Sequence, residues 1–209
     1  MSTAFCRSWI RLVLGAVVGG ILCVSVAQGQ QQDVAAGPAK KAEPSTAVEK
    51  FVARRGRLIV KDFYKVGVVE GKYLGSLDIQ LLVFSAPGAA SQDKVFGVRF
   101  ERPAVKDYES DETGFLDFDE SSALLEALAF METLAGRMSS EEHENTEVIY
   151  ETRGGMRLGF VQSGREQTAF VGVGGPIGGK HVFLTMGALN EVNKLLKQAV
   201  ARLGKMGAK

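Results

Sequence analysis

The glycine-rich segment 174–181 comes nearest to the spacing of a known chemistry. It reads Gly-Gly-Pro-Ile-Gly-Gly-Lys-His and fits the Gly-x4-Gly-Lys pattern of phosphate-binding loops, with Lys180 as the lysine. His181 stands where Ser or Thr would hold magnesium. Residues 182–184 read as a strand, whereas phosphate binding needs a helix whose first amides face the ligand. We therefore interpret the segment as a hairpin loop and assign it no cofactor.

Acidic residues gather between residues 107 and 120, and carboxylates serve both calcium sites and paired-carboxylate catalysis. They are Asp107, Glu109, Asp111, Glu112, Asp117, Asp119 and Glu120. The sequence lacks an Asp-x-Asp-x-Asp-Gly loop, and Asp117 to Glu120 resembles a capping box in which Asp117 or Asp119 accepts from free helix amides. We interpret the group as a solvated edge with helix caps, and we assign no metal ligand.

The remaining reactive side chains form no recognisable constellation. His143 and His181 stand at unrelated positions, which is not the spacing of a metal pair. The chain also lacks a Gly-x-Ser-x-Gly nucleophile elbow, so no catalytic residue is assigned. Aromatic residues on the expected strands could stack bases or sugars, although such residues more often fill a core. They are Phe63, Tyr64, Tyr73, Phe84, Phe96, Phe100, Tyr150, Phe160 and Phe170.

The stretch 114–138 predicts a short strand that runs into an amphipathic helix. Its large apolar residues recur every three or four positions and so share one helix face: Leu124, Leu128, Met131, Leu134 and Met138. A similar stretch follows near the C-terminus, with a strand at 180–184 and a helix at about 186–203. Thr185 is its expected N-cap and Gly204 its expected C′ residue. An offset of 68 residues places Leu128 on Leu196 and Phe115 on Phe183.

Further strands precede each of these units and are separated by turns. In the first half they span about 58–69, either 73–85 or 76–85, and 94–101, and a short helical turn is expected between residues 47 and 55. In the second half they span 146–152, 156–162 and 167–173. The sequence therefore predicts an α+β fold of two ββββα repeats, about 57–138 and 144–204. Each repeat is an antiparallel meander covered by an amphipathic helix.

This order of elements resembles that of single-stranded nucleic-acid binders of the Whirly and PUR-alpha type, which pack strand meanders with a helix in repeated units. The resemblance covers about residues 57–203 and lies in the element order, without a shared sequence motif, so no binding residue is carried over. It implies a single-stranded nucleic-acid binder that uses a sheet face. The near-neutral charge argues against that activity, because nucleic-acid binding draws on a basic field.

The N-terminus predicts export. Arg7 and Arg11 precede an uncharged, mostly apolar run of 15 residues, Leu12 to Val26, with small residues for cleavage after Gly29. We expect a signal peptide at 1–29, a disordered linker at 30–46 and one domain at 47–209. Both cysteines leave with the signal, and 23 basic residues then face 24 acidic ones. The mature protein would be periplasmic or extracellular, without stable membrane insertion.

These observations favour an exported, non-catalytic binding or interaction protein that needs no cofactor. Its expected partner is an unidentified protein, a small ligand or a second copy that pairs through an open sheet edge. Two alternatives remain from the sequence. One is a single-stranded nucleic-acid binder by fold analogy. The other is a hydrolase-type envelope enzyme, because the distance between two carboxylates in space cannot be read from their spacing along the chain.

Overall fold

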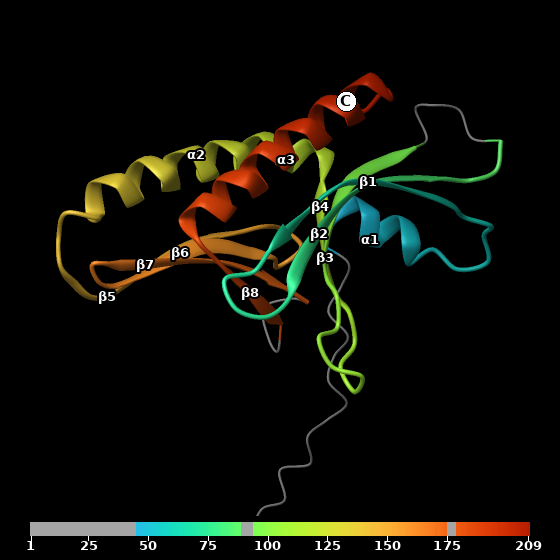
Figure 1. Ribbon diagram of the computed structural model, residues 1–209. Coiled ribbons are helices and arrows are strands. Elements are labelled where there is room, and N and C mark those ends of the chain that lie inside the picture. The colour runs from blue at the N-terminus through green and yellow to red at the C-terminus, as the bar shows by residue number, and fades with distance from the viewer. Residues whose placement is uncertain (1–44, 89–93, 175–178) are drawn as a thin grey trace, which may run out of the picture. The chain divides into compact units, whose positions relative to one another are not determined.

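The computed structural model describes residues 45–88, 94–174 and 179–209 (Figure 1). The expected signal peptide and nearly all of the expected linker lie outside these ranges. Two antiparallel four-stranded sheets follow one another along the chain, each with its strands in sequence order. The first holds β1 (Val60–Glu70), β2 (Ser76–Ser85), β3 (Val95–Arg102) and β4 (Glu112–Asp117). The second holds β5 (His143–Glu151), β6 (Arg157–Gly164), β7 (Glu166–Val173) and β8 (Lys180–Leu184).

A long helix follows each sheet, which confirms the predicted α+β fold of two ββββα repeats. A 3-10 turn, η2 (Phe118–Glu120), leads into α2 (Ser121–Met138), and β8 leads into α3 (Met186–Lys205). The short helix α1 (Ala47–Val52) precedes β1. No helix within the described residues is long and apolar enough to cross a bilayer.

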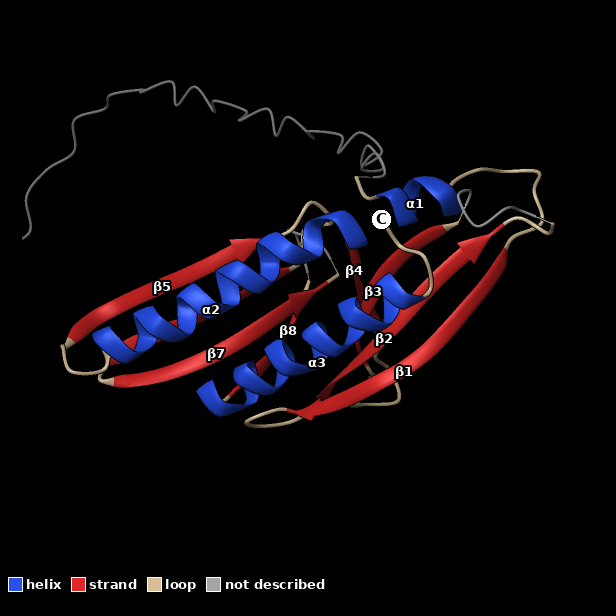
Figure 2. Cartoon of the chain, turned by 90° about the horizontal axis from the view of Figure 1, so that it is seen from above, coloured by secondary structure: helices blue, strands red, loops and turns tan. Residues whose placement is uncertain are grey.

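Each long helix packs mainly against the sheet of the other repeat. The principal strand contacts of α2 are with β5 and β6 of the second sheet, and α3 contacts β1, β2 and β3 of the first while reaching β7 and β8. Figure 2 shows α2 over the second sheet and α3 beside β2 and β3. Leu195 of α3 packs onto β1 at Gly67, where an added Cβ would lie 2.8 Å from its methyl carbons. Each repeat thus supplies the helix that covers the other repeat.

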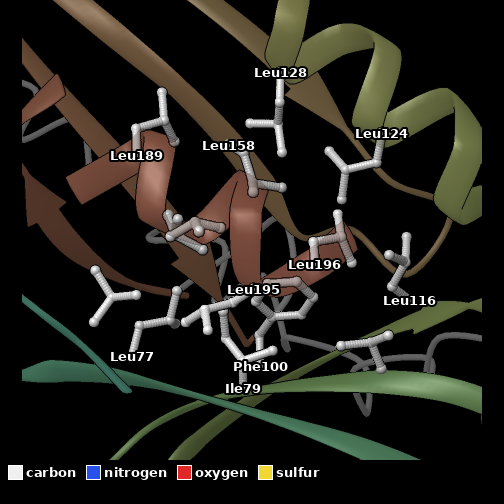
Figure 3. Close-up of a cluster of buried hydrophobic side chains, with 14 of the residues drawn as sticks. Leu77, Ile79, Phe100, Leu116, Leu124, Leu128, Leu158, Leu189, Leu195 and Leu196 are labelled. Atoms are coloured by element: carbon white, nitrogen blue, oxygen red, sulfur yellow. The ribbon is translucent and has the colours of Figure 1, made fainter. Parts of the chain in front are cut away.

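One apolar core joins both sheets and both helices (Figure 3). Leu128 and Leu196, which the 68-residue offset aligns, are 1% and 0% exposed. The side chains of Ile79 and Phe100 enter this core from the first sheet, and that of Leu158 enters it from the second. Burying each large aliphatic side chain stabilises the fold by about 1.5–3 kcal/mol before ordering entropy is subtracted. One continuous apolar core therefore contains residues of both repeats.

The other face of the first sheet carries a smaller apolar cluster under α1. Val48 and Phe51 of this helix pack on Leu82 and Phe84 of β2, and Phe115 of β4 joins them. The alternation of β2 predicts a partly wet outer face, and Asp78 and Gln80 meet that expectation at one end. At the other end α1 excludes water, because its apolar side chains pack on β2 and its first amides donate to Asp117 of β4.

Two expected helix ends differ in the structure. Asp117 makes no side-chain cap to the helix that follows it, and its carboxylate instead accepts from the amides of Ala47 (2.6 Å) and Val48 (3.2 Å) at the start of α1. At the C-terminus the helix runs past Gly204 to Lys205, and Gly207 adopts the left-handed conformation with φ of 97°. Glycine suits that conformation because it has no Cβ.

Candidate binding surfaces

The outer face of the second sheet carries four rings in contact, here called the aromatic cluster: Tyr73, Phe170, His181 and Phe183. Phe170 and Phe183 are cross-strand neighbours on β7 and β8, and His181 lies opposite Gly172. The imidazole of His181 stacks on Phe183 with centroids 6.2 Å apart and planes 24° apart, and it meets the edge of Phe170 at 5.5 Å. A Cβ on Gly172 would lie 2.9 Å from the Nε2 of His181, so this glycine makes room for the flat ring.

The fourth ring comes from the first repeat. Tyr73 lies in the β1–β2 turn, and its ring meets that of Phe183 at 6.2 Å with planes 69° apart. The preceding residue fastens this turn to the second sheet: the amide of Lys72 donates to the carbonyl of Phe183 at 2.6 Å, and its ammonium donates to Glu166 at 2.7 Å and Thr168 at 3.0 Å. The aromatic cluster therefore exists only when both repeats are folded and docked.

The two outermost rings are open to solvent and have no cover among the described residues. The exposed fraction is 67% for Tyr73 and 45% for Phe183, whereas Phe170 beneath them is 3% exposed. The ammonium of Lys72 lies 5.5 Å from the centroid of the Tyr73 ring. An edge-to-face pair of this kind contributes about 0.5–1.5 kcal/mol beyond area burial, which holds the two rings in a fixed arrangement.

Charge at this surface is balanced. The hydrogen bond that Lys72 donates to Glu166 raises the pKa of Lys72, and the same contact lowers the pKa of Glu166. Both groups are therefore ionised at neutral pH and neutralise one another. The rim offers hydrogen-bond donors and acceptors at Lys72, Thr168, His181 and the Tyr73 hydroxyl, without an excess of positive charge. Such a surface suits a neutral ligand that has one flat apolar face and polar edges.

The outer face of the first sheet carries a second, smaller aromatic surface at its uncovered end. Phe63 of β1 is 47% exposed, and the guanidinium of Arg99 lies 5.5 Å from its ring centroid. Lys61 and Lys65 point to the same outer face, because they lie opposite Phe84 and Gln80, two outward-facing residues of β2. Arg99 is also bound to Glu101 at 2.7 Å, which offsets part of the positive charge.

The lysine of the glycine-rich segment has a structural partner. Residues 175–178 lie outside the described ranges, but Lys180 begins β8, so a strand and not a helix follows. Its ammonium lies 3.5 Å from Glu109 and 4.0 Å from Glu112. The predicted interpretation as a hairpin connection agrees with this placement.

The acidic group divides into separate pairings. A hydrogen bond from Arg102 at 3.2 Å, joined by Lys180, lowers the pKa of Glu109, and Asp111 accepts from the amide of Ala104 at 2.8 Å. Within the described ranges, no group of three or more His, Cys, Asp or Glu side chains is arranged so that it could hold a metal ion.

The carboxylates at the start of α2 surround Arg153 of the β5–β6 turn. Its guanidinium contacts Asp117 at 3.4 Å, Asp119, and Glu120 at 3.4 Å, and its amide donates to Glu120 at 2.8 Å. The hydrogen bond with Asp119 raises the pKa of Arg153, which stays charged. These carboxylates join β4 and η2 of the first repeat to a hairpin of the second. The sequence predicted solvated helix caps here, but Asp117 and Glu120 are buried and cap neither η2 nor α2; their partner Arg153 was not predicted.

The histidines and aromatics predicted from sequence fall in different places. His143 lies 3.6 Å from Glu141 and 3.4 Å from Thr146, far along the chain from any other candidate. Of the aromatic residues named from sequence, four are core residues, Phe84, Phe100, Phe160 and Phe170. Phe183 was not among those named. The alternation of β8, with Val182 and Leu184 inward, places His181 and Phe183 outward and would have found it.

Comparison with known proteins identifies no relative of this chain. No protein-family model matches it, and neither the curated proteins nor the solved structures contain a significant match.

Proposed function

We propose that the protein is an exported, non-catalytic binding protein whose aromatic cluster binds the flat face of a pyranose ring in a neutral oligosaccharide. The observation that carries the proposal is the pair of exposed rings, Tyr73 and Phe183, fixed 6.2 Å apart on a sheet face that no described element covers. Exposed apolar groups held in place by hydrogen bonds and ring contacts are typical of recognition surfaces.

The charge balance at the site decides between classes of ligand. An anionic ligand would call for a free cation, but the ammonium of Lys72 is bound to Glu166 at 2.7 Å. A purely apolar ligand would displace water from the exposed His181 imidazole and Tyr73 hydroxyl without replacing its hydrogen bonds, which costs free energy. A sugar ring meets both conditions, since it offers C–H groups to the rings and hydroxyls to the rim.

A titration with neutral oligosaccharides tests this proposal. Cello-oligosaccharides and chito-oligosaccharides serve as probes, and the NMR resonances of Tyr73, His181 and Phe183 report binding. We expect saturable shifts confined to the aromatic cluster. The substitutions Tyr73→Ala and Phe183→Ala should each weaken binding by about tenfold, equivalent to roughly 1.4 kcal/mol.

Phe130→Ala is the matched control, because Phe130 is 58% exposed on α2 and lies outside the cluster. Its affinity should equal that of the unmodified protein. Resonances that do not move with either class of oligosaccharide, or binding that survives both cluster substitutions, would contradict the proposal.

The second candidate is single-stranded nucleic-acid binding at the outer face of the first sheet, in line with the Whirly and PUR-alpha element order. It is favoured by the cation over an exposed ring at Arg99 and Phe63, with Lys61 and Lys65 alongside. Oligothymidylate at low salt is the probe. Binding that falls steeply with salt and is lost in Phe63→Ala would support it, and no binding at low salt would exclude it.

A further inference from the structure

Two strands form the outermost edges of the described fold. The sheet orders give β1, β4, β5 and β8 a strand partner on one side only, and β4 contacts β7 of the other sheet, which leaves β1 and β5 as the outer edges. Figure 2 shows them on opposite sides of the fold, with both helices between them. The edge of β8 differs, because the amide of Lys72 already bonds the carbonyl of Phe183. An open strand edge presents unpaired amides and carbonyls, which favour pairing with another strand.

The first half of β1 is exposed on both of its faces. Every side chain from Val60 to Lys65 is exposed, including the large apolar groups Val60 (40%), Phe63 (47%) and Tyr64 (39%). Asp62 and Tyr64 are the inward-facing residues of this half. They lie opposite Val83 and Leu81 of β2, yet no described helix covers them. Arg202 of α3 already donates to the carbonyl of Lys65, so the backbone groups and apolar surface available to a partner lie between Val60 and Tyr64.

The two edges carry opposite charge. Residues 54–65, which lead into β1 and form its first half, contain five basic residues, Arg54, Arg55, Arg57, Lys61 and Lys65, and one acidic residue, Asp62. Residues 141–151, which lead into and form β5, contain five glutamates, at 141, 142, 144, 147 and 151. Within the described ranges, Lys61, Lys65, Glu144 and Glu147 make no ion pair.

We propose that copies of this chain associate head to tail, with the basic β1 edge of one copy pairing with the acidic β5 edge of the next. Like charges directly opposite one another disfavour β1 on β1 and β5 on β5, whereas opposite charges favour β1 on β5. The charges on each edge thus disfavour pairing with an identical edge of another copy and favour pairing with the edge of opposite charge.

The geometry of this contact determines the form of the assembly. A β1–β5 contact joins two different surfaces, so each copy keeps one free edge of each kind after pairing. Such a heterologous contact closes into a ring or continues as a chain, and it does not stop at a two-fold dimer. The inference goes beyond the proposed ligand binding, because it rests on strand edges and not on the aromatic cluster.

The first experiment measures the mass of the protein, as the expressing cell processes it, by light scattering and sedimentation. We expect the mass to rise with concentration at about 0.05 M NaCl and the association to weaken by roughly tenfold or more at about 0.5 M, where charges are screened within a few ångströms. A strict monomer across a broad concentration range at low salt would overturn the proposal.

Charge inversion tests the choice of edges. Within the strands that would pair, Lys61→Glu with Lys65→Glu gives the first half of β1 three acidic residues and no basic one, and Glu144→Lys with Glu147→Lys gives β5 two lysines against Glu151. These side chains are exposed, apart from one contact of the Lys61 ammonium with the Phe84 ring at 5.6 Å, and circular dichroism verifies the fold. We expect each variant alone to be monomeric, since its two outer edges then carry the same sign.

Two recombinations provide the decisive result. An equal mixture of the two variants should associate, because every acidic edge of one meets a basic edge of the other. A single chain with all four substitutions should also associate with itself. Variants that associate alone as well as the unmodified protein does, or a mixture that stays monomeric while the unmodified protein associates, would overturn the β1–β5 pairing.

Discussion

Leu196→Ala tests whether the exchanged helices make the two repeats one cooperative unit. Leu196 lies on α3 and is 0% exposed. This helix belongs to the second repeat, but it contacts β1, β2 and β3 of the first. Truncating a buried leucine costs about 2–5 kcal/mol through lost transfer free energy and the cavity left behind. For a domain of this size, that loss lowers Tm by roughly 4–20 °C.

The assay combines calorimetry with hydrogen exchange. We expect one unfolding transition at lower temperature, and faster exchange in both β3 around Phe100 and β6 around Phe160. Both of those rings are 0% exposed in the shared core. Gln198→Ala is the matched control, because Gln198 is exposed on the same helix and an exposed change there should alter stability by less than about 0.5 kcal/mol. Two separate transitions, or faster exchange in only one sheet, would refute the argument.

Three further predictions concern polar contacts. Asp117→Asn should lower the free energy of unfolding, measured with urea, by about 1–3 kcal/mol, because it weakens the cap on α1 and the ion pair with Arg153. Gln162→Leu should cost a similar ~1–3 kcal/mol and speed amide exchange in the last turn of α2, since the Gln162 amide bonds the carbonyls of Met138 and Glu141. Acid should lower the urea midpoint, starting below about pH 4.3, the ordinary pKa of glutamate.

The sign of the acid effect follows from two carboxylates. Burial alone would raise the pKa of Glu49, but hydrogen bonds from Thr46 and Ser45 outweigh it and lower that pKa. The hydrogen bond from Arg102 lowers the pKa of Glu109. A carboxylate with a lowered pKa in the folded state contributes stability above its unfolded pKa, and this contribution is lost as the pH falls through the folded pKa. A urea midpoint that is unchanged or higher at pH ~3 than at pH ~6 would contradict this reasoning.

The sequence predicted the parts of the fold that local periodicity determines. The three-to-four spacing identified the buried face of α2, and the alternation of β2 identified Leu77, Ile79 and Leu81 as inward residues, all 0% exposed. The bounds of β8 at 180–184 are as predicted. These features depend on residues within a few positions of one another, so the sequence carries them directly.

The exchange of helices could not be predicted in the same way. Periodicity shows which face of a helix is buried but not which sheet buries it, because that choice depends on contacts between residues far apart in the chain. The same limit applies to Asp117, whose partners Ala47 and Val48 lie about 70 positions away. Tyr73 reaches the aromatic cluster only because Lys72 fastens its turn to β7 and β8.

Several of the polar contacts that could not be predicted join the two repeats. Arg153 of the second repeat binds the carboxylates before α2, and Gln162 of β6 caps the C-terminal end of that helix. In the other direction Arg202 of α3 donates to the carbonyl of Lys65 at 3.2 Å, beside the bulge in β1 at Val66. Helix ends and bulges leave backbone groups unpaired, and here the opposite repeat satisfies them.

The two repeats differ most where their outer faces correspond. The 68-residue offset places Phe115 on Phe183, and both rings point to the outer face of their sheet. In the first repeat α1 covers that position, and Phe115 packs against a cluster with Val48 and Phe51. In the second repeat no described element takes the place of α1, and Phe183 stays 45% exposed beside Tyr73. The same ββββα arrangement thus carries a second apolar cluster on the outer face of one sheet and exposed aromatic rings on the outer face of the other. We propose that the ligand binds to these exposed rings.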